Sequence, residues 1–187
     1  MNKTRKAICL LPIGLLCAVF IYPFLHELGH GLVVFLLGAK VVELQWFPLP
    51  SILCRMNSIG ATEYVVAGMG GIIFPAALCL LIRCNRKFWI WYAVFIVRLI
   101  CIWSLLLAAI SIVLFKFGIL LPNDDMTQIL QIYPQQWWVC GVLIVVMCLS
   151  LCISVAKSKP IQRIVDAECK PLRLHSASIL LLCVLPL

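Results

Sequence analysis

Two histidines four residues apart, with a glutamate beside the first, are the residues of this 187-residue chain best suited to chemistry. They form the motif H-E-x-x-H at His26, Glu27 and His30. On a helix the two imidazoles lie about 40° apart on one face, so they can bind one zinc ion. Zinc lowers the pKa of a coordinated water toward about 7, and Glu27, about 100° around the helix, can accept the proton as that water attacks a carbonyl. The motif therefore predicts a zinc-dependent hydrolase with Glu27 as the catalytic base.

A catalytic zinc needs a third protein ligand and one open position. The remaining candidates are His175, Cys54 and the acidic pair Asp124 and Asp125. His175 lies in a basic tail that we expect on the opposite side of the membrane, whereas the acidic pair follows a loop expected on the same side as the end of the first apolar run. We prefer Asp124 as the third ligand, with Asp125 and then Cys54 as alternatives.

The acidic pair also has a structural interpretation. Asn and Asp side chains accept hydrogen bonds from the free N–H groups of a first helical turn. Asn123 or Asp124 would then cap a short helix over Asp125 to Ile132. We favour the ligand interpretation over the cap.

The composition places these residues in a membrane. Hydrophobic residues make up 64% of the chain and charged residues 12%, against about 25% charged in soluble domains. The mean hydropathy is +1.12. The apolar residues form long unbroken runs without alternation, which excludes a β-barrel, a soluble globule and a disordered chain. The sequence predicts an integral, multi-pass protein whose surroundings are the lipid bilayer.

The fold class that we predict is an all-α membrane protein, a polytopic bundle of about four transmembrane helices. A short re-entrant or strand-like loop follows the first helix, where Val41 to Phe47 alternate and end at prolines. The last apolar stretch is shorter than the ~20 residues of a spanning helix, so we expect it to be interfacial or re-entrant. The four predicted spans are about 7–37, 60–82, 88–115 and 137–156, and the last stretch is 176–187. We divide the chain into a transmembrane metallopeptidase-like domain, 1–156, and a basic cytoplasmic tail with a short apolar end, 157–187.

The basic residues predict an orientation. Eleven of the fifteen Lys and Arg lie in the N-terminus, the 83–87 turn and the tail, whereas the other two loops contain Lys40, Arg55 and Lys116. The positive-inside rule therefore places both termini in the cytoplasm, in a cell membrane. The basic clusters lack the aromatic and polar surface of a nucleic-acid module, so we expect no nucleic-acid partner. The eleven cysteines, mostly within apolar runs, are interpreted as small buried hydrophobic residues.

The sequence leaves open the roles of Arg98 and of two glycines, and the depth of the motif in the membrane. Arg98 lies in the middle of the third run, where it would pair with Glu63, line a wet cavity or snorkel; we favour a structural role. Gly29 and Gly31 suit either close helix packing or the shaping of a cleft. The 20 residues from Lys6 to His26 span about 30 Å of helix, which would place the motif at the far interface unless a bend or tilt draws it deeper.

The sequence His26-Glu27-Leu28-Gly29-His30-Gly31 within an apolar run resembles the site-2 protease family of intramembrane zinc metalloproteases. In that family three membrane helices form the core, the first helix carries H-E-x-x-H, and a later helix supplies an Asp as third zinc ligand. The resemblance covers about residues 10 to 132. Its two further segments are Ala67-Gly68-Met69-Gly70-Gly71, which keeps the family's Ala-Gly, and Phe117-Gly118-Ile119-Leu120-Leu121-Pro122-Asn123-Asp124-Asp125, which is similar to a shortened version of its Asp motif.

Together the motif and the resemblance predict an intramembrane zinc metalloendopeptidase. Its substrate would be a membrane-tethered protein, His26, His30 and Asp124 would hold zinc, and Glu27 would act as base and then as acid toward the leaving amine. One alternative is a non-catalytic metal-binding membrane protein of the same fold. A second is a small transporter component in which the motif and Arg98 form a polar pathway, but this gives no reason for the H-E-x-x-H spacing.

Overall fold

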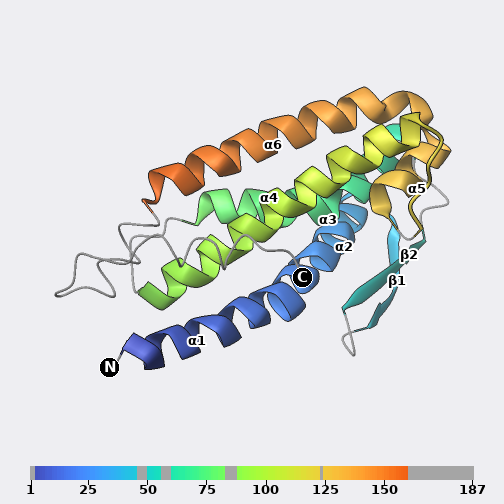
Figure 1. Cartoon of the computed structure of the whole chain (residues 1–187). Coiled ribbons are helices and arrows are strands. Elements are labelled where there is room, and N and C mark those ends of the chain that lie inside the picture. The colour runs from blue at the N-terminus through green and yellow to red at the C-terminus, as the bar shows by residue number, and fades with distance from the viewer. Residues whose placement is uncertain (1–2, 46–49, 56–59, 83–87, 123, 160–187) are drawn as a thin grey trace.

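The structure is a computed structural model that describes residues 3–45, 50–55, 60–82, 88–122 and 124–159. It is mostly helical, with four long apolar helices that qualify as membrane spans and a small β-hairpin after the first (Figure 1). The predicted fold class is thereby confirmed. The predictions for His175, for the apolar stretch 176–187 and for most of the tail lie outside the described residues.

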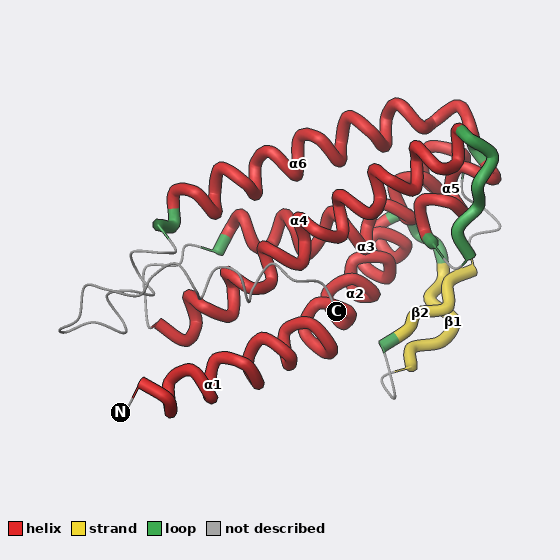
Figure 2. The backbone as a smooth tube through the Cα atoms, in the orientation of Figure 1, coloured by secondary structure: helices red, strands yellow, loops and turns green. Residues whose placement is uncertain are grey.

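The elements follow one another with short connections, and the long helices run side by side along one axis (Figure 2). The four candidate spans are Leu10–Leu36, Ala61–Leu81, Phe88–Lys116 and Pro134–Lys157. The helices are α1 Lys3–Leu16, a π-helix η1 Cys17–Ile21, α2 Tyr22–Leu36, α3 Ala61–Leu81, α4 Phe88–Lys116, α5 Asp125–Ile132, a 3-10 helix η2 Pro134–Gln136, and α6 Trp137–Lys157. The strands are β1 Lys40–Gln45 and β2 Ser51–Arg55.

The first span is one continuous helical segment with a π-helical turn in its middle. The N–H of Tyr22 donates to the carbonyl of Cys17, five residues back. Pro23 follows directly and has no N–H to donate. In a regular α-helix its ring would clash with the carbonyl four residues before it, and the wider π-helical turn relieves this clash. The span continues to Leu36, which places His26 and His30 within it and not at its far end.

A glycine ends the first span and starts the hairpin. Gly38 has a φ of 75°, and the N–H of Ala39 donates to the carbonyl of Val34 at 3.0 Å. This is the Schellman arrangement, which needs a residue tolerant of left-handed backbone. β1 and β2 then pair antiparallel, with an irregularity between Val41 and Glu43. The strand-like segment predicted from the sequence is β1; its partner β2 was not predicted.

Arg98 has a structural role. Its side chain is buried on α4 and donates from Nε and Nη2 to the carbonyl of Cys79, at 3.2 and 2.9 Å, and from Nη2 to the carbonyl of Ile82 at 3.1 Å. Since the last carbonyls of a helix have no partner within the helix, the guanidinium caps α3. Glu63 is instead bonded to the N–H of Gly60 at the start of α3, so the pairing of Arg98 with Glu63 considered from the sequence does not form.

The core lies between α3, α4 and α6, and α5 closes one end of it (Figure 1). Although α5 has only eight residues, half of them are buried, so the short helix is held by tertiary packing. Fully buried members of the core include Met69, Leu105, Met126, Leu130 and Leu151.

Candidate metal centre

Three side chains from two distant parts of the chain converge at one point. The Nε2 atoms of His26 and His30 lie 3.2 Å apart. The Oδ2 atom of Asp125 lies 3.0 Å from Nε2 of His26 and 3.3 Å from Nε2 of His30. All three candidate ligand atoms lie within 4.8 Å of one another, so the group could hold a metal ion. The side chains are partly buried, with exposed fractions of 19%, 17% and 35% for His26, His30 and Asp125.

The third member of the group is Asp125, and the preference for Asp124 is corrected. Asp124 is the N-cap of α5: its Oδ2 accepts hydrogen bonds from the N–H and from the Oγ1 of Thr127, each at 2.8 Å. A carboxylate used in this way faces its own helix. Asp125, the next residue along α5, faces the histidines. Of the acidic pair, Asp124 therefore has the capping role, and Asp125 is the member placed where it could act as a ligand.

Helix α5 is aligned so that Asp125 meets the histidines. Asp125, Ile129 and Tyr133 are four residues apart and follow one face of the segment. A Cβ on Gly68 of α3 would lie 2.5 Å from Cδ1 of Ile129, so Ile129 packs where α3 has no side chain. One turn further, the rings of Tyr64 and Tyr133 meet edge to face at 5.7 Å. These two contacts set the position of α5 along α3 and thereby the position of its carboxylate.

The second nitrogen of His30 is held by the backbone. Its Nδ1 lies 2.9 Å from the carbonyl oxygen of Ala67. A carbonyl only accepts, so Nδ1 carries the proton and donates it. The lone pair is then on Nε2, which is the atom directed at His26 and Asp125. An imidazole that donates to a carbonyl and directs its other nitrogen at a shared point is arranged as metal-binding histidines are.

A glycine on α3 lets both imidazoles lie directly against the helix backbone. A Cβ on Gly71 would lie 2.3 Å from Nε2 of His30 and 2.8 Å from Nε2 of His26. No larger residue fits there without moving the candidate ligands. The preceding Gly70 has a different role: its Cβ would lie 2.8 Å from the carbonyl oxygen of Gly29, so α2 and α3 cross there with their backbones in contact.

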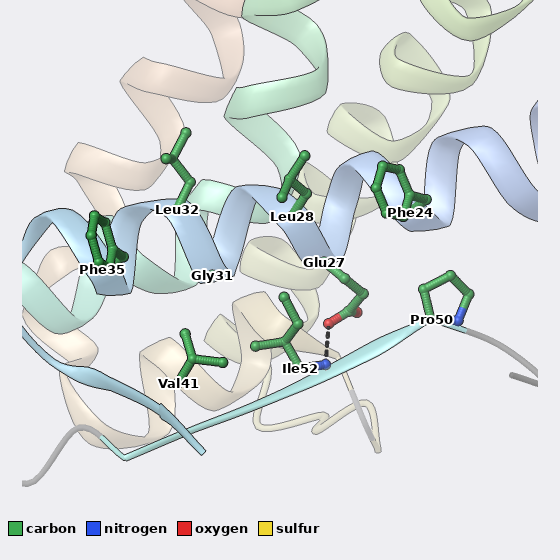
Figure 3. Close-up of a pocket in the computed structure, with 9 residues that line it drawn as sticks. All are labelled: Phe24, Glu27, Leu28, Gly31, Leu32, Phe35, Val41, Pro50 and Ile52. Atoms are coloured by element: carbon green, nitrogen blue, oxygen red, sulfur yellow. Dashed lines mark hydrogen bonds between the residues drawn. The ribbon is translucent and has the colours of Figure 1, made fainter. Parts of the chain in front are cut away.

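Glu27 lies on the adjacent face of α2, toward the hairpin. Its Oε2 accepts a hydrogen bond from the N–H of Ile52 in β2 at 3.0 Å (Figure 3). The side chain forms part of the wall of a groove of about 260 Å³ between α2 and the hairpin. A Cβ on Gly31 would lie 2.7 Å from Cδ1 of Ile52, so Gly31 brings this strand close to the helix. The other residues that line the groove are Phe24, Leu28, Leu32, Phe35, Val41 and Pro50.

The two glycines of the motif therefore divide the roles considered for them. Gly29 serves helix packing against Gly70, and Gly31 shapes the groove beside Ile52. As a result, the candidate metal group and the groove lie on adjacent faces of α2. Glu27 follows His26 in the sequence and lines the groove.

Cys54, an alternative third ligand from the sequence, has a packing role. It pairs with Val41 in the hairpin and packs against Val34, Ala39 and Ala67. Burial, and then the nearby Glu27 carboxylate, raise the pKa of the Cys54 thiol. A raised pKa disfavours the thiolate that would bind a metal, so the structure gives Cys54 no part in the group.

The charge of Asp125 is stabilised by the two histidines. Burial tends to raise the pKa of this carboxyl, but when the imidazoles also carry a proton on Nε2 their hydrogen bonds and charge outweigh the burial and hold the pKa below its usual range. The carboxylate is therefore ionised at neutral pH, as a metal ligand must be.

Sequence reasoning missed two parts of the site: the close approach of the imidazoles to Gly71 and the carbonyl of Ala67. Both lie in the segment Ala67-Gly68-Met69-Gly70-Gly71. The density of glycine was the available signal, because glycine within a helix is costly by roughly 1 kcal/mol relative to Ala and marks a close approach. The density of glycine did not show which glycine contacts the histidines and which contacts α2 or α5.

Comparison of the chain with models of known protein families, with curated proteins and with solved structures found no match. The functional argument therefore depends on the site itself. The structure establishes a multi-pass arrangement of candidate spans with a His-His-Asp group that could hold a metal ion.

Proposed function

We propose that this protein is an intramembrane zinc metalloendopeptidase that hydrolyses peptide bonds of membrane-tethered proteins. The observation that carries the proposal is the convergence of His26, His30 and Asp125 on one point, beside a glutamate whose position in the sequence completes H-E-x-x-H. The resemblance of this motif to the site-2 protease family agrees with the proposal.

The residues present fit zinc. Two imidazole nitrogens and one carboxylate oxygen form a three-ligand set that leaves one coordination position open, which is typical of catalytic zinc. The bond from His30 to Ala67 and the close approach of both imidazoles to Gly71 support the same assignment. When bound there, zinc would supply a Lewis acid and an activated water.

The chain's own catalytic group is Glu27. Its carboxylate accepts a proton during attack on the scissile carbonyl and returns that proton to the leaving amine. The N–H of Ile52 now occupies Oε2 of Glu27. This bond holds the carboxylate at the groove, where an extended segment of a substrate can reach it. The apolar lining of the groove favours a substrate segment with apolar side chains.

The bilayer provides the setting for this reaction. His26 and His30 lie within the first candidate span, so the peptide bond would be cut in or near the membrane. The distribution of Lys and Arg supports a cell-membrane protein with both termini in the cytoplasm. Residues 40–59 and 118–135 would then face the other side.

The test separates chemistry from metal binding. Glu27→Gln preserves size and hydrogen bonding but cannot accept the proton, so we expect wild-type zinc content and hydrolysis of a membrane-tethered reporter reduced by roughly 10²–10⁴-fold. Glu43→Gln is the matched control, because Glu43 is exposed on β1, and it should hydrolyse normally. His26→Ala should lose both zinc and activity.

Three other outcomes would each contradict a different part of the proposal. Hydrolysis at the wild-type rate by Glu27→Gln would refute the peptidase mechanism. Stoichiometric zinc without hydrolysis of any membrane-tethered reporter by the wild type would favour a non-catalytic metal-binding protein. Equal trace zinc in the wild type and in His26→Ala would refute the metal site itself.

A further inference from the structure

Two buried polar atoms beside the metal group have no hydrogen-bond partner in the described part of the chain: Nδ1 of His26 and the hydroxyl oxygen of Tyr22. A buried polar group without a partner is destabilising, so such atoms are uncommon and need a physical explanation. Two of them on neighbouring turns of one helix suggest a shared explanation.

The two residues lie on the same face of α2. Tyr22 is the first residue of α2 and precedes His26 by four positions, and their ring centroids are 6.0 Å apart with planes inclined at 45°. The hydroxyl of Ser104 on α4 lies beside the Tyr22 hydroxyl without meeting the geometry of a hydrogen bond, and the Asp125 carboxylate is close enough to act on it electrostatically. The Tyr22 hydroxyl therefore lies among the polar groups of the site.

The chemistry of metal-binding histidines indicates what is missing. Such a histidine almost always donates its second N–H to an acceptor, which sets the tautomer and the ring orientation. His30 does so through the carbonyl of Ala67 at 2.9 Å. His26 also directs Nε2 at the group, but its Nδ1 still lacks an acceptor.

We propose that Tyr22 is the positioning residue for His26 and that its hydroxyl holds one buried water that accepts the N–H of His26 Nδ1. A buried water needs two to four polar partners, and His26 Nδ1, the Tyr22 hydroxyl and the Ser104 hydroxyl supply three. The arrangement gives the two histidines equivalent support, from a backbone carbonyl for His30 and from a tyrosine-held water for His26.

The π-helical turn contributes to this placement. It ends at Ile21, immediately before Tyr22. An inserted residue in a helix rotates the preceding turns relative to the following ones, and such insertions are frequent at functional sites. Tyr22 is the first residue that shares the α-helical register of His26 and His30, so it falls on their face.

This inference depends on the metal-binding half of the proposed function and does not depend on catalysis. The probe is Co²⁺, which replaces zinc in such sites and shifts the proton signals of its ligands. In the purified protein with Co²⁺ we expect two shifted, exchangeable imidazole N–H signals, one for each histidine. In Tyr22→Phe, one signal should broaden or vanish through exchange with water, whereas the His30 signal should persist.

A second readout compares the metal affinity with the thermal stability of the metal-free protein. Tyr22→Phe should weaken metal binding by roughly 10–100-fold, the range typical of such supporting partners. Without metal, however, it should change the thermal stability little, because the ring and its packing remain and only one water-mediated hydrogen bond is lost. Tyr92→Phe is the matched control: Tyr92 is a buried tyrosine near the start of α4, and its loss should leave both N–H signals and the metal affinity unchanged.

The outcomes are distinguishable. If the wild type binds no Co²⁺ or zinc, the proposed metal site fails and the role of Tyr22 fails with it. If the wild type binds metal and Tyr22→Phe keeps both N–H signals and wild-type affinity, only the role of Tyr22 is refuted. If Tyr22→Phe loses affinity together with metal-free stability, Tyr22 is a packing residue and the proposal is also wrong.

Discussion

Replacement of Gly71 by alanine tests the metal centre with one methyl group. The new Cβ would lie 2.3 Å from Nε2 of His30 and 2.8 Å from Nε2 of His26, whereas ordinary van der Waals contact begins near 3.4 Å. Nε2 of His30 must therefore move by about 1 Å. Zinc–nitrogen bonds are 2.0–2.1 Å long and tolerate about ±0.2 Å. A displacement several times larger than that tolerance removes His30 as a ligand.

We expect Gly71→Ala to bind zinc at least ~100-fold more weakly than the wild type, since weakening a supporting partner alone costs 10–100-fold. The fold should survive, because alanine is a better helix former than glycine by roughly 1 kcal/mol. The assay is zinc content per chain after purification in detergent, followed by competition with a chelator of known affinity. Thermal unfolding of the metal-free protein reports separately on folding.

Gly141→Ala is the matched control, because a Cβ at Gly141 on α6 meets no other atom within 4 Å. It should keep wild-type zinc content and affinity. The reasoning is refuted if Gly71→Ala binds zinc as tightly as the wild type, since the ion would then lie somewhere other than between His26, His30 and Asp125. Loss of zinc together with loss of metal-free folding would show instead that Gly71 serves helix packing.

Three further predictions follow from the described contacts. Asp125→Ala should lower zinc occupancy, whereas Asp124→Ala should keep it and lower the free energy of unfolding by about 1 kcal/mol through loss of the helix cap. Zinc analysis of both variants tests this prediction, and the reverse pattern would indicate Asp124 as the ligand. Arg98→Met should lower the free energy of unfolding by about 1.5–3 kcal/mol through loss of charged hydrogen bonds to the end of α3, with zinc content unchanged. An unchanged unfolding free energy would mean that this cap is dispensable. Gln128 is exposed on α5, so Gln128→Cys should gain labelling by an impermeant maleimide from outside intact cells, and labelling only from the cytoplasmic side would reverse the proposed orientation.

The long helices could be predicted from the sequence because their signal is local. A spanning helix must satisfy its backbone hydrogen bonds within itself, so an unbroken apolar run of sufficient length determines it. The predicted runs agree with the four candidate spans. The pairing of the two candidate ligand histidines was equally local, because a spacing of four residues places His26 and His30 on one helix face.

The hairpin was only partly predictable. Val41 to Phe47 alternate in a way that indicates a strand, and this segment overlaps β1 from Val41 to Gln45. Its partner β2 has no comparable alternation: it is defined by pairing with β1 and by the bond from the N–H of Ile52 to Glu27. A strand stabilised by its neighbours cannot be identified from its own residues.

The third candidate ligand could not be chosen from the sequence. Asp124 and Asp125 are adjacent and chemically alike, and the choice between them depends on where α5 lies against α3. That placement comes from Ile129 packing over Gly68 and from the contact between Tyr64 and Tyr133. The sequence by itself determined the membrane spans and the H-E-x-x-H face, because both depend on residues close together in the chain. Only the tertiary structure decided that Asp125 joins His26 across a separation of 99 residues, because that contact depends on how separate helices pack.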